Sequence, residues 1–136
     1  MIYVFDASFI GSLIIPDENN HLVDELLSAI DDNEEIFAPQ LLWYELANIF
    51  KNLIRRKRYS FDEVLRFCSL MTAIHLTCDF ETGIAYSEKL LRICNDYNIS
   101  SYDAAYLELA GRRKAVLCTM DKNLQTVAKK YGVVTL

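Results

Sequence analysis

The chain has 136 residues, of which 52% are hydrophobic, with 4 Gly, 2 Pro and a formal net charge of −5. This size and apolar content predict one globular domain over residues 1–136 and exclude a disordered or repetitive chain. No apolar run is long enough to span a membrane and no signal peptide is visible, so we expect a cytoplasmic protein without a membrane partner. The acidic balance argues against a uniformly basic surface for duplex binding, although a local basic patch is compatible with it. The four cysteines lack CxxC spacing, which excludes a zinc-site pattern.

Short buried strands are predicted to alternate with helices along the whole chain. The expected strands cover residues 2–5, 36–38, 75–78, 115–118 and 133–136. The expected helices cover residues 7–15, 20–30, 40–58, 60 to about 74, 81–97, 100–110 and 122–131. Strands separated by helices favour right-handed crossovers, which place helices on both faces of a parallel sheet. We therefore predict an α/β fold of the Rossmann-like kind, a three-layer α/β/α sandwich around a central parallel sheet of four to five strands.

Two acids follow apolar strands. Asp6 comes directly after residues 2–5, and Asp121 comes three residues after residues 115–118. In open parallel sheets the carboxyl ends of the strands open onto the ligand crevice, so both acids are candidates for a functional site. The alternative is that each acid only caps the helix that follows it.

Two further acids lie on the expected helices. Glu45 borders an apolar stripe, and Asn48 projects on the same side as a further polar group. Asp103 is expected in a first helical turn on the packed side, whereas Glu108 marks the solvent side. The alternatives are a surface ion pair for Glu45, and for Asp103 a cap formed with Ser100.

Convergence of these four acids would have a chemical consequence. Carboxylates gathered at one crevice repel one another unless a cation is present. Oxygen ligands without His or Cys suit Mg²⁺ or Mn²⁺. Such an ion can activate water and neutralise the charge that develops on a phosphoryl oxygen, and the sequence offers no protein nucleophile beside a base. The pattern predicts a nuclease that hydrolyses phosphodiester bonds with metal-activated water.

The motifs around these acids resemble those of the PIN-domain family. They are Val4-Phe5-Asp6-Ala7-Ser8, the stretch 39–48 around Glu45, the stretch 101–110 around Asp103, and Thr119-Met120-Asp121-Lys122-Asn123-Leu124. The likeness covers essentially the whole chain and is greatest to VapC-type toxins of toxin–antitoxin pairs.

This resemblance implies a parallel α/β/α sandwich and a Mg²⁺- or Mn²⁺-dependent endoribonuclease that cleaves single-stranded or structured RNA. It implies a small antitoxin as partner, and it suggests a homodimer. The catalytic, metal-binding acids would be Asp6, Glu45, Asp103 and Asp121. Ser8 and Thr119 would be supporting polar groups.

One dense basic run is a candidate for RNA binding. It contains Lys51, Arg55, Arg56 and Arg58. These cations could lead a nucleic-acid backbone toward Glu45, and binding would then weaken steeply with salt. The alternative is a solvated helix end whose cations complement the helix dipole. Neighbouring aromatic residues, Trp43 and Tyr44 among them, could stack bases or belong to the core.

Two other functions remain open from the sequence. A receiver-like or phosphoryl-transfer domain would use Asp6 as nucleophile, but Ser8 stands where a phosphatase of that type would want a second acid. The other alternative is a catalytically silent PIN-like domain that binds RNA or protein.

Overall fold

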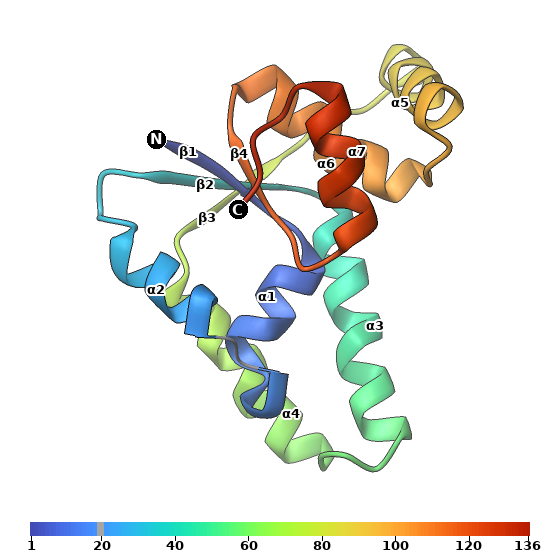
Figure 1. Cartoon of the computed structure of the whole chain (residues 1–136). Coiled ribbons are helices and arrows are strands. Elements are labelled where there is room, and N and C mark those ends of the chain that lie inside the picture. Colours follow the sequence, from blue (N-terminus) through green and yellow to red (C-terminus); the bar gives the residue numbers. More distant parts are fainter. Residues whose placement is uncertain (19–20) are drawn as a thin grey trace.

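A computed structural model describes residues 1–18 and 21–136 of the chain, and its core is one parallel sheet (Figure 1). The strands are β1 (Ile2–Phe5), β2 (Glu35–Pro39), β3 (Leu76–Asp79) and β4 (Val116–Cys118). Their order in the sheet is β3-β2-β1-β4, and every pair is parallel. The first strand of the chain therefore lies inside the sheet, with Val4 in register with Phe37 on one side and Leu117 on the other.

Seven α-helices connect and cover the strands in the part of the chain that is described. They are α1 (Ala7–Ile14), α2 (His21–Ala29), α3 (Leu41–Arg55), α4 (Phe61–Leu70), α5 (Ile84–Tyr97), α6 (Ser101–Arg113) and α7 (Lys122–Tyr131). Two 3₁₀ turns, Pro16–Glu18 and Met71–Ala73, follow α1 and α4. None of these helices, within the described ranges, combines the length and the apolar character that a membrane crossing needs.

The sheet is buried on both faces by different helices. Tyr3 and Phe5 pack into a core that includes side chains of α1, α3 and α4. Val4 and Phe37 pack into a second core with α6 and α7. Side chains alternate between the two faces of a strand, so a continuous apolar run such as residues 2–5 can serve both cores. The predicted α/β/α sandwich is confirmed.

Several element boundaries differ from those expected. The expected strand 133–136 is reduced to one isolated bridge between Leu117 and Thr135, so the named sheet has four strands. The helix expected to reach residue 58 ends at Arg55, and the chain turns at Lys57, whose φ is 57°. The helix expected from residue 81 begins after Gly83, which has a φ of 97° that favours glycine. The start expected at residue 20 lies outside the described residues.

Candidate active site

All four acids line one cavity at the carboxyl ends of β1 and β4, which we call the acidic cavity. It has a volume of about 610 Å³. Asp6 follows β1, Asp121 precedes α7, Glu45 lies on α3 and Asp103 lies in the first turn of α6. The other lining residues are Ala7, Ser8, Leu41, Tyr44, Asn48, Ile49, Tyr102 and Tyr106. Four segments far apart in the sequence thus bring their carboxylates to one place, as the crossover topology of the sheet predicts.

Asp6 is buried, with only 5% of its surface exposed, and is held from three directions. Its Oδ1 accepts hydrogen bonds from the Phe9 amide at 2.8 Å and from the Ser8 hydroxyl at 2.7 Å. The Thr119 hydroxyl donates to its Oδ2. Asp6 therefore does cap α1, and it also lies in the wall of the acidic cavity. Capping and a place in the site are compatible for this residue.

The loop after β4 is fixed to the start of α1 by the same hydroxyls. The Met120 amide donates to Ser8 Oγ at 3.0 Å, and the Asp121 amide donates to Thr119 Oγ1 at 3.0 Å. Asp121 in turn caps α7, because its Oδ1 accepts from the Leu124 amide at 3.0 Å. The two predicted supporting residues, Ser8 and Thr119, therefore join the strand ends that carry Asp6 and Asp121.

Glu45 is positioned by Tyr106, a residue for which the sequence alone predicts no place in the site. The hydroxyl of buried Tyr106 donates to Glu45 Oε1 at 2.6 Å and so connects α6 to α3. Its signal in the sequence was its place three residues after Asp103, on the same face of α6. Asp103 itself donates its amide to the Ser100 hydroxyl at 3.1 Å, which confirms the expected cap, while its carboxylate accepts no hydrogen bond from the described residues.

Burial and mutual repulsion act on the acids of the acidic cavity. Burial first, and then the nearby Asp121, raises the pKa of Asp6 despite its hydrogen bonds. Burial raises the pKa of Glu45, and Asp6 and Asp103 raise it further, although the bond from Tyr106 acts in the opposite direction. The pKa of Asp103 is raised by burial, then by Asp121 and Asp6.

The lining of the acidic cavity fits a hard cation chemically. Among the residues that the structure describes, its wall contains no Lys, Arg or His. Repulsion among the carboxylates favours their protonated forms, and a divalent cation relieves this repulsion when it binds. Oxygen-only donors suit Mg²⁺ or Mn²⁺. Among the described residues, no three Asp, Glu, His or Cys side chains are arranged so that they could already hold a metal ion.

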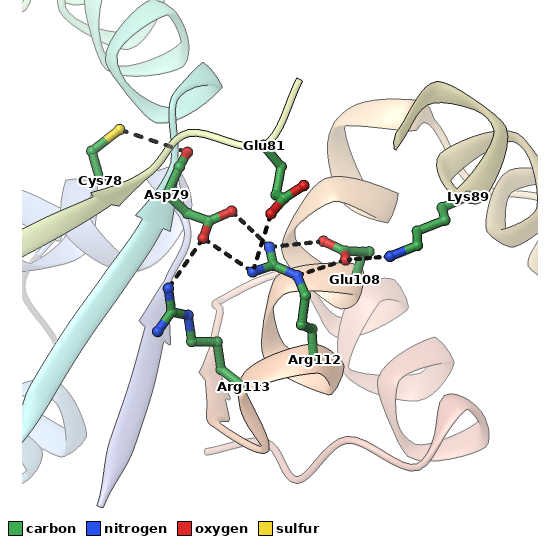
Figure 2. A network of polar contacts seen from close by, with 7 residues as sticks. All are labelled: Cys78, Asp79, Glu81, Lys89, Glu108, Arg112 and Arg113. Carbon is green, nitrogen blue, oxygen red and sulfur yellow. Dashed lines mark hydrogen bonds and ion pairs between the residues drawn. The ribbon is translucent and has the colours of Figure 1, made fainter. Parts of the chain in front are cut away.

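A second group of buried carboxylates lies outside the acidic cavity and contains its own cations (Figure 2). Arg112 on α6 contacts Asp79 Oδ2 at 2.6 Å and Glu108 Oε1 at 2.8 Å. Arg113 reaches Asp79 at 3.4 Å, and Lys89 on α5 lies 3.9 Å from Glu108. We call these five residues the Arg112 network.

The expectation that Glu108 faces solvent is wrong. Glu108 is only 5% exposed, because α5 packs against α6 and the side of α6 that looked polar is covered. Its partner Arg112 is one helical turn away, at the i, i+4 spacing that joins opposite charges on a helix.

The residues predicted to bind RNA divide into two groups. Lys51, Arg55 and Arg56 are exposed on or just after α3. Arg58 instead forms ion pairs with Asp17 and, at 2.9 Å, with Glu18, so its charge is already paired within the chain. Arg56 and Arg58 line a smaller hollow of about 420 Å³ that shares Ser8 with the acidic cavity.

Comparisons with known proteins identify the family and the fold. The family described as PIN domain matches residues 3–130. Ribonuclease VapC3 of Pyrobaculum aerophilum is 25% identical over 124 residues, which cover 91% of this chain and 92% of that protein. A chain in the crystal structure of VapBC2 from Rickettsia felis, bound to a DNA fragment from their promoter, has a TM-score of 0.73 at 13% identity and covers 100% of this chain and 98% of that one.

A further solved structure is Mycobacterium tuberculosis VapC20, described as a sarcin–ricin loop cleaving toxin. It has a TM-score of 0.67 at 13% identity, with 93% of this chain and 94% of that chain covered. Likeness at these identities concerns the fold.

Proposed function

Because this chain belongs to the PIN-domain family, we propose that it is a metal-dependent endoribonuclease and the toxin of a toxin–antitoxin pair. The observation that carries the proposal is the acidic cavity, in which four carboxylates from four segments meet without a basic lining residue in the described part of the chain. The similarity to a protein named a ribonuclease supports the reaction class, and likeness to VapBC proteins supports the toxin assignment. Its action would take place in the cytoplasm, on RNA.

The carboxylates of Asp6, Glu45, Asp103 and Asp121 would hold Mg²⁺ or Mn²⁺. When bound, such an ion supplies a Lewis acid that lowers the pKa of water and neutralises charge on a phosphoryl oxygen. Ser8 and Thr119 hold the carboxylate of Asp6 in one orientation through their hydroxyls. Tyr106 does the same for Glu45 and leaves Glu45 Oε2 without a hydrogen-bond partner in the described residues.

Lys51, Arg55 and Arg56 would attract the RNA backbone, with Asn48 as a polar contact in the cavity wall. Counterion release makes this contribution fall with rising salt. Arg58 contributes less, because Asp17 and Glu18 already neutralise it.

The protein partners belong to the same proposal. A small antitoxin and a homodimer are expected, and exposed apolar side chains on α4 offer surface for such contacts. They include Phe61, Leu65 and Leu70.

The test is cleavage of end-labelled RNA by wild type, Asp6→Asn and the control Asp96→Asn, with Mn²⁺ or with EDTA. Asp6→Asn keeps the acceptor that caps α1 but removes a charge from the acidic cavity, so we expect at least about a hundredfold loss of rate. Asp96 is exposed near the end of α5 and lies outside the cavity, so its variant should cleave like wild type. Equal cleavage by Asp6→Asn and wild type, or cleavage in EDTA, would overturn the proposal. RNA binding without any cleavage would favour the silent PIN-like domain instead.

A further inference from the structure

Two exposed tyrosines stand in the wall of the acidic cavity. Tyr44 on α3 is 71% exposed and directly precedes Glu45. Tyr102 on α6 is 62% exposed and directly precedes Asp103. Neither hydroxyl has a hydrogen-bond partner among the described residues. Each helix thus places an unburied aromatic ring beside its carboxylate, and the packing of the fold does not account for either ring.

The acidic cavity has few groups that could attract RNA, and these two rings can add binding energy there. A polyanion that approaches four carboxylates is repelled, and the lining contains no basic side chain in the described ranges. The exposed cations of α3 lie outside the lining of this cavity. Apart from the phosphate contact that a bound divalent cation would supply, the lining itself offers binding energy only through contacts that do not depend on charge.

Stacking of bases on tyrosine is a contact that does not depend on the charge of the nucleic acid. Every base has a π face, so stacking is tolerant of sequence. A tyrosine ring has only two side-chain torsions, which keeps the entropy lost on ordering small. A base can stack on a protein side chain only when one of its own faces is free. This is the case in a single strand or a loop but not inside a duplex.

We propose that Tyr44 and Tyr102 are stacking platforms for unpaired bases on either side of the phosphodiester that enters the acidic cavity. The family resemblance already implies single-stranded or structured RNA as substrate, and these two rings would be the residues that select its unpaired bases. The inference rests on the proposed function for the cleavage step, whereas the stacking itself is a binding property that stands apart from turnover.

The experiment measures binding by fluorescence anisotropy in an Asp6→Asn background, in which we expect cleavage to be at least about a hundredfold slower. Three labelled probes of equal length are used: a single-stranded RNA, the same strand annealed to its complement, and a strand with the same phosphates but abasic positions. We expect Tyr44→Ala and Tyr102→Ala each to weaken binding of the single strand about tenfold or more. Binding of the abasic and duplex probes should not change.

Matched variants separate the role of the aromatic ring from that of the hydroxyl and from that of any exposed apolar side chain. Tyr44→Phe and Tyr102→Phe keep the ring and should bind like the parent. Phe80→Ala removes a side chain that is 70% exposed but lies outside the acidic cavity, and it should have no effect. The loss caused by Tyr→Ala should stay constant as salt rises, whereas the loss caused by Arg56→Ala should shrink.

Three results would overturn the stacking proposal. They are unchanged single-strand binding in both alanine variants, an equal loss with the abasic probe, and an absence of RNA binding by the parent. In the first case the exposed rings would fit a protein interface better.

Cleavage of the abasic strand by wild type with Mn²⁺, at saturating strand concentration, distinguishes this failure from that of the proposed function. This diester has no aromatic ring to stack, so its cleavage depends on the acidic cavity and should be lost in Asp6→Asn. If wild type cleaves neither this diester nor RNA while the alanine variants still lose single-strand binding, the nuclease proposal fails and the stacking proposal stands.

Discussion

The acidic cavity and the Arg112 network both bury carboxylates, but only the network supplies positive charge from within the chain. Burial raises the pKa of Asp79, yet the hydrogen bonds and charges of Arg112 and Arg113 outweigh it, so its pKa lies below its ordinary value (Figure 2). In the acidic cavity, burial and the neighbouring carboxylates outweigh the hydrogen bonds, so the pKa values of Asp6, Glu45 and Asp103 are raised.

Helix α6 takes part in both regions, and this makes the contrast informative. Its first turn carries Asp103 into the acidic cavity, and its later turns carry Glu108 and Arg112 into the network. Basic residues are therefore available on the same helix, and they neutralise only one of the two groups. The carboxylates of the acidic cavity raise one another's pKa values and have no basic partner among the described residues, so the difference supports a cation from outside the chain at the cavity.

The largest expected effect comes from breaking the network. Arg112→Met removes the main partner of Asp79 and Glu108 and leaves two buried carboxylates poorly compensated. We expect the free energy of unfolding to fall by about 3 kcal/mol, measured by urea denaturation at neutral pH. Arg92→Met, on the exposed part of α5, is the control and should change stability little. A loss of the same size in both variants would mean that the network is no more than surface charge.

A smaller effect should follow from filling the acidic cavity. Mn²⁺ at about 100 times its dissociation constant should raise the free energy of unfolding by about 2.7 kcal/mol, because it binds only the folded state. The increment should persist in Arg112→Met and largely vanish in Asp103→Asn, as followed by thermal unfolding with and without EDTA. Equal stabilisation of wild type and Asp103→Asn would place the ion elsewhere.

The smallest expected effect is a pH-dependent gain in the stability of Asp103→Asn, measured in the absence of metal. The pKa of Asp103 is raised in the folded state from its ordinary value of 3.8. Its contribution to stability is therefore greatest at low pH and falls as pH rises through that value toward the folded-state pKa. Asp103→Asn should thus be more stable than wild type at neutral pH by a few tenths of a kcal/mol, since solvent screens a half-exposed group.

This gain should disappear below about pH 4, where wild-type Asp103 is also neutral. Asp62→Asn, in the first turn of α4, isolates the loss of the favourable helix-dipole interaction and should not be stabilising. A wild type that is more stable than Asp103→Asn at neutral pH would contradict the repulsion inferred for the acidic cavity.

The central part of the fold could be predicted because burial and chain order leave few choices. The apolar run 2–5 and the alternation of strands with helices were sufficient for a parallel sheet with Asp6 at a strand end. The terminal strand was overestimated, because a run of apolar residues does not say whether the sheet offers a full edge to pair with. Only the bridge from Thr135 to Leu117 forms.

The meeting of the four acids at one cavity could be predicted, but the contacts around them could not. Periodicity placed Glu45 and Asp103 toward the packed side, and the structure brings both to the acidic cavity. The prediction from helical periodicity was wrong for Glu108, because periodicity treats a helix in isolation, whereas α5 covers that side of α6. Likewise, no local pattern could reveal that Arg58 turns back to Asp17 and Glu18, or that the Tyr106 hydroxyl reaches Glu45.

The hydrogen bond between Thr119 and Asp6 joins residues that are 113 positions apart, and this has a consequence for protein synthesis. Asp6 leaves the ribosome before Thr119, Asp121 and strand β4, because synthesis runs from the N-terminus. A nascent chain that stops before them leaves β1 unpaired on one side and the first carboxylate of the acidic cavity without its hydroxyl partner. A chain interrupted before Thr119 therefore lacks both Asp121 in the cavity wall and the hydroxyl that holds Asp6.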